Sequence, residues 1–254
     1  TVIGQIIAAI LALVFNLKCN RELNISMKGF RPNGYLIVQI YKVGAPSIVV
    51  QAIGSLMTYG MNLILAAFGS AQTVFGIYFK LQSFVFMPVF GLNNGMVPII
   101  AYNYGAGHKD RVIKTIKHSV AYGVGIMFVG LLAMHIFPAQ LMRMFDAEES
   151  LIAIGAPALE TISLSFVFAG FCIVAGSVFQ ALGNGVYSMI VSVARQMCVL
   201  LPVAKLLSLS GEVTLIWWAF PIAELASVLL TSYFLVRIYR KVICHIGEPV
   251  VQDA

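Results

Sequence analysis

The sequence predicts an all-α integral membrane protein: a polytopic helical bundle with six complete transmembrane helices, preceded by the end of another. Of the 254 residues, 60% are hydrophobic and only 10% are charged. A soluble domain is about 45–50% apolar and about 25% charged. The mean hydropathy is +0.92. Because the apolar runs are long and uninterrupted, they favour helices over the alternating strands of a membrane barrel.

Seven apolar segments fit the template of about 20 residues that a transmembrane helix needs. The first reads as the last part of a span. The third and fifth exceed the required length, so tilt, kinks or extension beyond the lipid are expected there. The segments are residues 1–17, 43–68, 73–104, 112–137, 151–182, 187–209 and 214–238.

The loops between these segments differ in charge, and this difference predicts the topology. Loops rich in Lys and Arg alternate with loops that have almost none, so the positive-inside rule places the first loop and the C-terminus in the cytoplasm. The net charge of +6 and the pI of about 9.2 are therefore topology signals and do not indicate nucleic-acid binding. On one side lie Lys18, Arg21, Lys28, Arg31, Lys42, Lys109, Arg111, Lys114, Lys117, Arg237, Arg240 and Lys241.

The charge pattern also suggests a division of the chain. Residues 18–42 are expected to form a polar cytoplasmic connector, residues 43–241 a six-helix lobe, and residues 242–254 a cytoplasmic tail. This arrangement predicts a multi-pass membrane protein with its C-terminus in the cytoplasm.

One stretch, residues 80–107, is unusually polar and rich in Pro and Gly for a span. Pro88 and Pro98 each remove a backbone donor, so we expect this helix to be broken near its middle. Gly91 and Gly95 form a Gly-x-x-x-Gly pair that would let another helix approach closely. Broken, polar helices are typical of transporters.

Ionisable residues inside spans suggest function, because burying them is costly. Lys80 either snorkels to the outer interface or faces a cavity. Arg195 either clamps helix ends or carbonyls or lies on the transport pathway. Glu160, three residues after Pro157, has a partly hydrated structural role or an ion-pathway role. Glu224 is either hydrated by a kink at Pro221 or paired with Arg195.

The polar amides within the spans are expected mainly to join helices, although some would line a substrate cavity. The candidates for substrate contact or transport are Gln51, Tyr59, Asn62, Lys80, Gln82, Asn93, Asn94, Glu160, Gln180, Arg195 and Glu224. The candidates for helix breaks or close packing are Pro46, Pro88, Gly91, Gly95, Pro98, Gly183 and Pro202.

Signals of catalysis are absent from the sequence. There is no HExxH, GxSxG or Walker loop, and no two acidic residues lie within one helical turn inside a span. The four His are too dispersed for a metal site. The four Cys have no paired spacing and read as free thiols. We therefore expect no enzyme, catalytic residue, metal or cofactor.

Two long motifs resemble the MATE (multidrug and toxic compound extrusion) transporter family, in its bacterial MepA/DinF-like branch. They are QSFVFMPVFGLNNGMVPIIAYNYGAG with the following HKDRV, and FQALGNGVYSMIVSVARQMCVLLP. The Gly44-Ala45-Pro46 opening also resembles the start of the family's seventh helix. The resemblance implies a twelve-helix fold of two lobes, of which residues 1–17 are the end of helix six and residues 43–241 the C-terminal lobe.

The resemblance also implies a function. Family members export drugs and other organic compounds, often cations, in exchange for H+ or Na+ through alternating access. The implied partners are organic cations, the lipid bilayer and an N-terminal lobe that this chain lacks, without nucleic acid. The resemblance further implies a location in a bacterial cell membrane, and it implies that the chain is inactive alone.

This sequence departs from one branch of the family. NorM-like members bind the coupling cation with carboxylates that correspond by register to positions near Gly54 and Ala169, and neither is acidic here. No span contains Asp, so we expect coupling to lie in the other half. The alternatives are a flippase of lipid-linked oligosaccharides from the same superfamily, and a structural half-transporter that does not transport. A membrane-embedded enzyme is disfavoured because no catalytic constellation is present.

Overall fold

The structure is a computed structural model that describes residues 2–19 and 31–247. The chain divides into two compact units, Thr1–Tyr41 and Lys42–Ala254. In the first unit, α1 (Val2–Cys19) is an apolar helix with Lys18 in its last turn. The predicted helix at residues 1–17 is therefore confirmed. Residues 20–30 of the expected connector lie outside the described residues, as does the end of the tail from residue 248.

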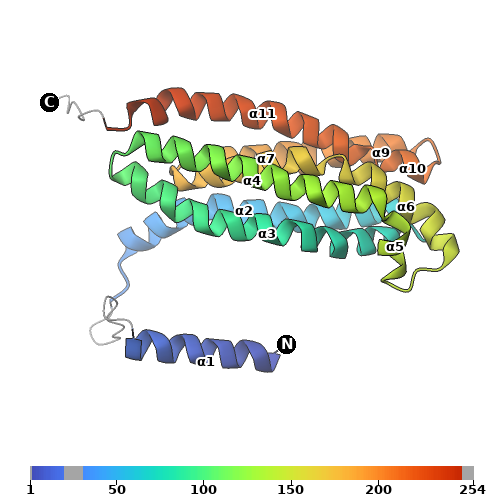
Figure 1. Cartoon of the computed structure of the whole chain (residues 1–254), viewed down its shortest axis with the longest axis horizontal. Coiled ribbons are helices and arrows are strands. Elements are labelled where there is room, and N and C mark those ends of the chain that lie inside the picture. The colour runs from blue at the N-terminus through green and yellow to red at the C-terminus, as the bar shows by residue number, and fades with distance from the viewer. Residues whose placement is uncertain (1, 20–30, 248–254) are drawn as a thin grey trace. The chain divides into compact units, whose positions relative to one another are not determined.

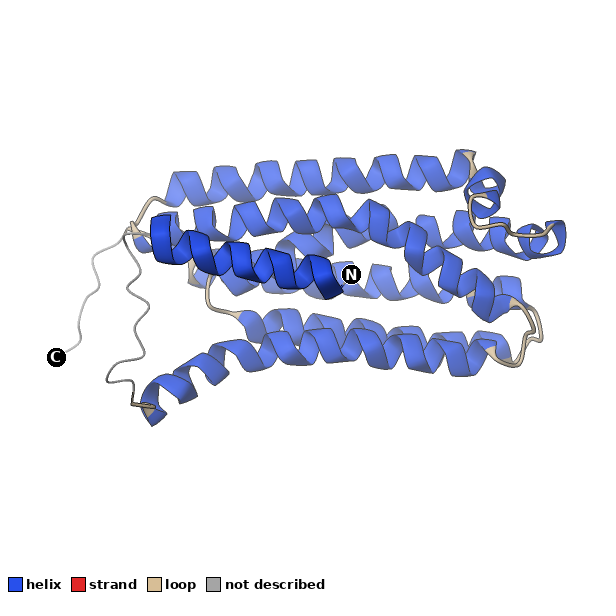
Figure 2. Ribbon diagram, turned by 90° about the horizontal axis from the view of Figure 1, so that it is seen from below, coloured by secondary structure: helices blue, strands red, loops and turns tan. Residues whose placement is uncertain are grey.

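The second unit is helical, and Figure 2 shows only helices and loops in its described part. The helix α2 (Gly34–Leu65) begins nine residues before the expected span, so the C-terminal end of the predicted connector is helical. The helices that follow are α3 (Ala71–Gly105), α4 (Lys109–Ile136), α5 (Pro138–Arg143), α6 (Glu149–Ser163), α7 (Phe166–Ala181), α8 (Gly185–Val193), the π-helix η1 (Ala194–Leu200), α9 (Leu201–Ser208), α10 (Val213–Ile216), α11 (Ala219–Lys241) and the 3-10 helix η2 (Ile243–His245).

Five helices are long and apolar enough to span a membrane, and six if the bent pair α6 and α7 counts as one span. These numbers refer to residues 2–19 and 31–247, and they confirm the predicted all-α membrane fold. The helices α3, α4, α7 and α11 run side by side in Figure 1, and each successive pair is in contact. The core between the helices contains the fully buried rings of Phe75 and Trp217, whose centroids are 6.5 Å apart.

The expectation of a break in residues 80–107 is wrong. Pro88 and Pro98 lie inside one continuous helix, α3. Each proline removes one hydrogen bond, but the remaining bonds on both sides keep the helix intact. Gly91 and Gly95 also differ from expectation, since a Cβ added to either would meet no atom within 4 Å. No helix of the described chain packs closely against this glycine pair.

The interruptions occur in other spans. The fifth span bends by 49° between α6 and α7. At this bend the Ser163 hydroxyl donates to the Glu160 carbonyl at 2.9 Å and the Ser165 hydroxyl donates to the Ile162 carbonyl at 2.6 Å. Serine side chains that bond to nearby carbonyls compete with the helical ladder and favour bending.

The sixth span contains the π-helix η1, which ends two residues before Pro202. The amide of Leu201 donates to the Gln196 carbonyl, five residues back. Pro202 has no amide hydrogen, so it cannot close the next α-helical bond. The predicted irregularity at Pro202 is therefore present as a widened turn, and that turn carries Arg195.

Glycine ends two of the helices, and the break expected at Gly183 is one of these ends. Gly183 has a φ of +75° and follows α7, and Gly107 has a φ of +74° and follows α3. At the first end, the amide of Asn184 bonds to the Phe179 carbonyl at 2.8 Å. At the second, the amide of His108 bonds to the Asn103 carbonyl at 2.9 Å. Both are Schellman caps, in which only glycine adopts the left-handed conformation without steric cost.

Candidate functional site

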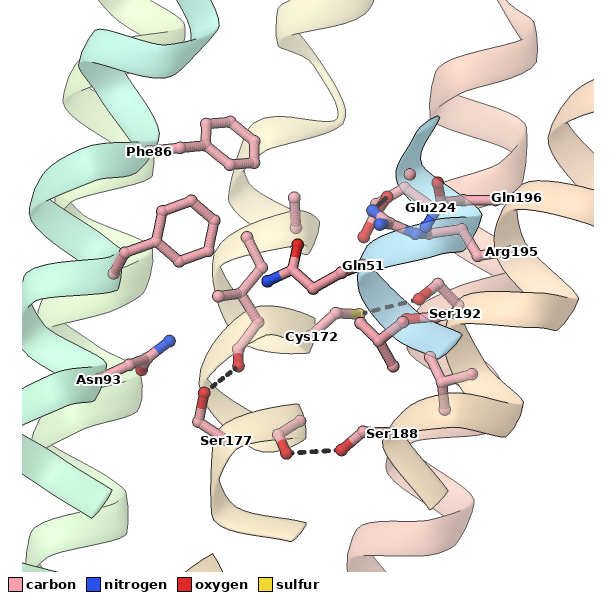
Figure 3. A pocket seen from close by; sticks show the side chains of 18 of the residues that line it. Gln51, Phe86, Asn93, Cys172, Ser177, Ser188, Ser192, Arg195, Gln196 and Glu224 are labelled. Carbon is pink, nitrogen blue, oxygen red and sulfur yellow. Dashed lines mark hydrogen bonds and ion pairs between the residues drawn. The ribbon is translucent and has the colours of Figure 1, made fainter. Parts of the chain in front are cut away.

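A cavity of about 880 Å³ opens within the second unit, between α2, α3, α7, α8, η1 and α11. Figure 3 shows Phe86 and Asn93 pointing from α3 into the cavity, with Arg195, Gln196 and Glu224 grouped on the opposite side. This volume lies within the range of small-molecule sites, which are mostly apolar with a few polar groups. The lining includes the rings of Tyr78, Phe79, Phe86, Phe90 and Phe220 and the amides of Gln51, Gln82, Asn93, Asn94 and Gln180.

Helical periodicity brings these residues to the same wall. On α3, the lining residues Gln82, Phe86, Phe90, Asn93 and Val97 recur every three or four positions. Residues at this spacing share one face of a helix. The polar face of α3 therefore points into the cavity, which accounts for amides in an otherwise apolar span.

The cavity contains one ion pair that joins two helices. Arg195 on η1 donates from a guanidinium nitrogen to Oε2 of Glu224 on α11 at 3.0 Å. The side chains are 29% and 6% exposed. The second carboxylate oxygen of Glu224 has no hydrogen-bond partner in the structure. Of the two alternatives for Glu224, the pairing with Arg195 is the one that the structure contains.

Small polar side chains form a second set of lining residues, which sequence reasoning missed. The Ser188 hydroxyl of α8 donates to the Gly176 carbonyl of α7 at 2.7 Å, and the Ser227 hydroxyl of α11 donates to Cys172 Sγ at 3.4 Å. Both bonds join different helices beside the cavity. Serine is common in membrane helices, so its identity alone carried no signal. Only the packing of α7, α8 and α11 brings these serines together beside the cavity.

The structure brings together seven of the eleven candidates for substrate contact. Four others do not line this cavity. Lys80 is exposed, with its amine 5.7 Å from the centroid of the Phe145 ring. Asn62 donates to the Thr58 carbonyl, and Tyr59 and Glu160 lie elsewhere on α2 and α6. The seven that line the cavity are Gln51, Gln82, Asn93, Asn94, Gln180, Arg195 and Glu224.

Two positions singled out by their register also line the cavity. Gly54 and Ala169, which the resemblance places near the positions of the carboxylates in the NorM-like branch, both lie on the cavity wall. Neither carries a side chain that binds a cation. Pro46, the proline of the short opening motif, lies outside the lining, and its Cβ would be 3.6 Å from a Cβ added at Gly185 of α8.

The fold and cavity can now be compared with known proteins. A family model described as MatE matches residues 46–206. The chain belongs to this family. The match includes α3 and the segment from α7 to α9, which contain the two long motifs, so the resemblance inferred from those motifs is confirmed. MatE proteins are transporters rather than enzymes.

Two MatE relatives are multidrug export proteins named MepA. The protein from Staphylococcus aureus (strain MSSA476) is 27% identical over 226 residues, which cover 88% of this chain and 49% of that protein. The protein from Staphylococcus haemolyticus (strain JCSC1435) is 25% identical over 242 residues, which cover 95% of this chain and 53% of that protein. The chain thus spans about half the length of the curated relatives that it matches.

Solved structures of MatE transporters share the fold. The MATE multidrug transporter DinF-BH, solved as a complex with a bound compound, superposes with a TM-score of 0.82 at 32% identity, over 94% of this chain and 54% of that one. A MATE protein in the straight conformation gives a TM-score of 0.83 at 16% identity, over 96% of this chain and 55% of that one. At the lower identity the likeness concerns the fold alone.

If the cavity admits water and ligands, cysteines placed on its wall should be accessible. In a variant with the four native cysteines replaced by serine, we expect Gln51→Cys and Gln180→Cys to react with a water-soluble thiol reagent and a bound dye to slow the reaction. Both side chains are exposed and line the cavity. Tyr59→Cys, an exposed position on α2 outside the lining, is the control. Equal dye protection at all three positions would contradict the assignment of the cavity.

Proposed function

We propose that this chain is part of a secondary antiporter that exports organic compounds, often cations, in exchange for H+ or Na+. The observation that carries this proposal is the cavity of about 880 Å³ lined by rings and amides, within a member of a transporter family. Rings offer apolar and cation–π contacts without strict shape demands. The multidrug export relatives and the multidrug transporter among the solved structures support substrates of this kind.

We propose that residues 43–241 form one lobe of a two-lobed transporter. Support comes from the half-length match to the relatives. In this arrangement the open side of the cavity faces a second lobe, and transport requires both. The basic residues around Lys109 and Lys241 support a cytoplasmic position for the C-terminus, in the membrane of a bacterial cell.

We propose that ion coupling resides in the other lobe. Asp110 lies in the first turn of α4 and Asp146 in the loop before α6, and no expected span of this chain contains Asp. Of the two carboxylates in spans, Glu224 is bound by Arg195 and Glu160 lies outside the cavity lining. A flippase for lipid-linked sugars is less supported, because holding pyrophosphate favours a cationic cavity and the arginine of this cavity is paired.

The two-lobe proposal predicts that residues 1–254 alone do not transport. In liposomes with an imposed proton or sodium gradient, we expect no dye uptake from this chain, and uptake when it is joined to the N-terminal lobe of its full-length protein. In the joined protein, Glu160→Gln should keep ion-driven uptake. Gradient-driven uptake by the monomeric 254-residue chain would refute the need for two lobes, and complete loss of uptake in a folded Glu160→Gln protein would place coupling in this lobe.

A further inference from the structure

The wall of the cavity contains few charged side chains. Of the described residues that line it, only Arg195 and Glu224 belong to the charged types, and they have opposite sign. The remaining polar lining consists of neutral amides, hydroxyls and the Cys172 thiol. With both side chains ionised, the wall carries no net charge.

The cancellation depends on Glu224, because Arg195 stays protonated. A guanidinium cannot be deprotonated in a protein, so the arginine contributes +1 whatever its partner does. The two groups are 3.0 Å apart, so their fields largely cancel at the distance of a ligand. Without Glu224, an uncompensated positive charge would face the cavity, and charges on partly buried groups are screened less than exposed ones.

The rest of the lining favours cations once that charge is cancelled. Tyr78, Phe79, Phe86 and Phe220 present rings to the cavity, and ring faces attract cations. The amide oxygens of the wall add neutral acceptors. Nothing else among the described lining residues would repel a cation.

We infer that the Arg195–Glu224 pair sets the charge selectivity of the cavity: Glu224 cancels the charge of Arg195, so an organic cation meets a neutral, ring-lined wall. This inference rests on the proposed function, in which the cavity forms part of the substrate wall. It assigns a specificity-determining role to an ion pair whose other possible role is only to hold η1 and α11 together.

The test is dye binding to the purified 254-residue chain in detergent, followed by fluorescence polarisation. Three xanthene dyes of similar size serve as probes: a cationic rhodamine ester, a net-neutral rhodamine and an anionic fluorescein ester. Glu224→Gln should lower the ratio of cation to anion affinity about tenfold or more, as expected for one added charge roughly 10 Å from the ligand. Binding of the neutral dye should change little. The double variant R195Q/E224Q should return the ratio to that of the wild type.

A second variant protects the test if Glu224→Gln does not fold. Gln51→Arg adds one positive charge to the cavity wall at an exposed side chain and leaves the buried pair intact. It should lower the same ratio in the same direction. Gln140→Arg adds the same charge at an exposed position outside the cavity and should leave the ratio unchanged.

The outcomes separate this inference from the proposed function. A wild-type chain that binds none of the three dyes would contradict the substrate wall and the inference together. A wild-type chain that binds dyes, with the same affinity ratio in folded Glu224→Gln or in Gln51→Arg, would overturn the charge-selectivity role alone. A double variant with a ratio as low as that of the single one would also overturn it, because cancellation would not be the cause.

Discussion

Replacing Gly170 by leucine is expected to prevent folding of the second unit. Gly170 on α7 lies against Gly123 and Met127 on α4, and a Cβ added there would be 3.0 Å from the Gly123 carbonyl oxygen and 2.9 Å from Met127 Cγ. The carbonyl is backbone, so α4 itself would have to move. Overpacking of this kind costs about 1–3 kcal/mol and occasionally more, and the shift of a backbone carbonyl places this site at the upper end. We expect the monodisperse peak in size-exclusion chromatography to disappear or to melt far below the wild type.

Gly125 supplies the matched control, because it lies on α4 two residues from Gly123 and a Cβ there would meet no atom within 4 Å. Gly125→Leu should give a monodisperse protein with nearly the wild-type melting temperature. Gly91→Leu should behave in the same way in this chain, despite its Gly-x-x-x-Gly motif. If Gly170→Leu were as stable as these two variants, the close approach of α4 and α7 would be wrong.

The spans themselves were predictable because a single physical quantity, the thickness of the bilayer, sets the length of each apolar run. The fourth span, expected at residues 112–137, is α4 at Lys109–Ile136. The helix interruptions were not predictable in the same way. Pro88 and Pro98 are strong local signals, yet α3 continues through both. The bend at residues 163–165 has weaker local signals. Tertiary packing decides whether a carbonyl that loses its helical hydrogen bond finds another partner, and the local sequence does not contain that information.

The candidate site was predictable in part. Lys80, Glu160, Arg195 and Glu224 are equivalent by sequence, since each is an ionisable residue in an apolar segment. Only Arg195 and Glu224 meet, across 29 positions of the chain. Their meeting depends on the packing of η1 against α11, and η1 is a π-turn that no periodicity template contains. The amides of α3 were recognised from their polarity, whereas the serines of α7, α8 and α11 needed the three-dimensional arrangement.

The second large effect is expected at the ion pair. Glu224→Leu should destabilise the protein by about 3–5 kcal/mol, because it leaves the partly buried guanidinium of Arg195 without its counter-charge. Arg195→Met should cost a similar amount, since Glu224 is 5% exposed and one of its carboxylate oxygens already lacks a partner. Melting temperatures of the purified variants, combined in a double-mutant cycle, measure both costs and their coupling.

The double variant R195M/E224L shows whether Arg195 and Glu224 stabilise the protein as one unit. Replacing a buried pair by apolar side chains of similar volume is often neutral or stabilising, so we expect the double variant to be more stable than either single one. The exposed pair Arg143–Glu149, at 2.9 Å with side chains 61% and 80% exposed, is the control. Glu149→Leu should change stability by less than about 1 kcal/mol. If the double variant were as unstable as the sum of the single ones, the pair would not act as one unit. A stable double variant with altered charge selectivity would instead mean that the pair stabilises the contact between η1 and α11. It would also mean that the charges of Arg195 and Glu224 act on a ligand independently of each other.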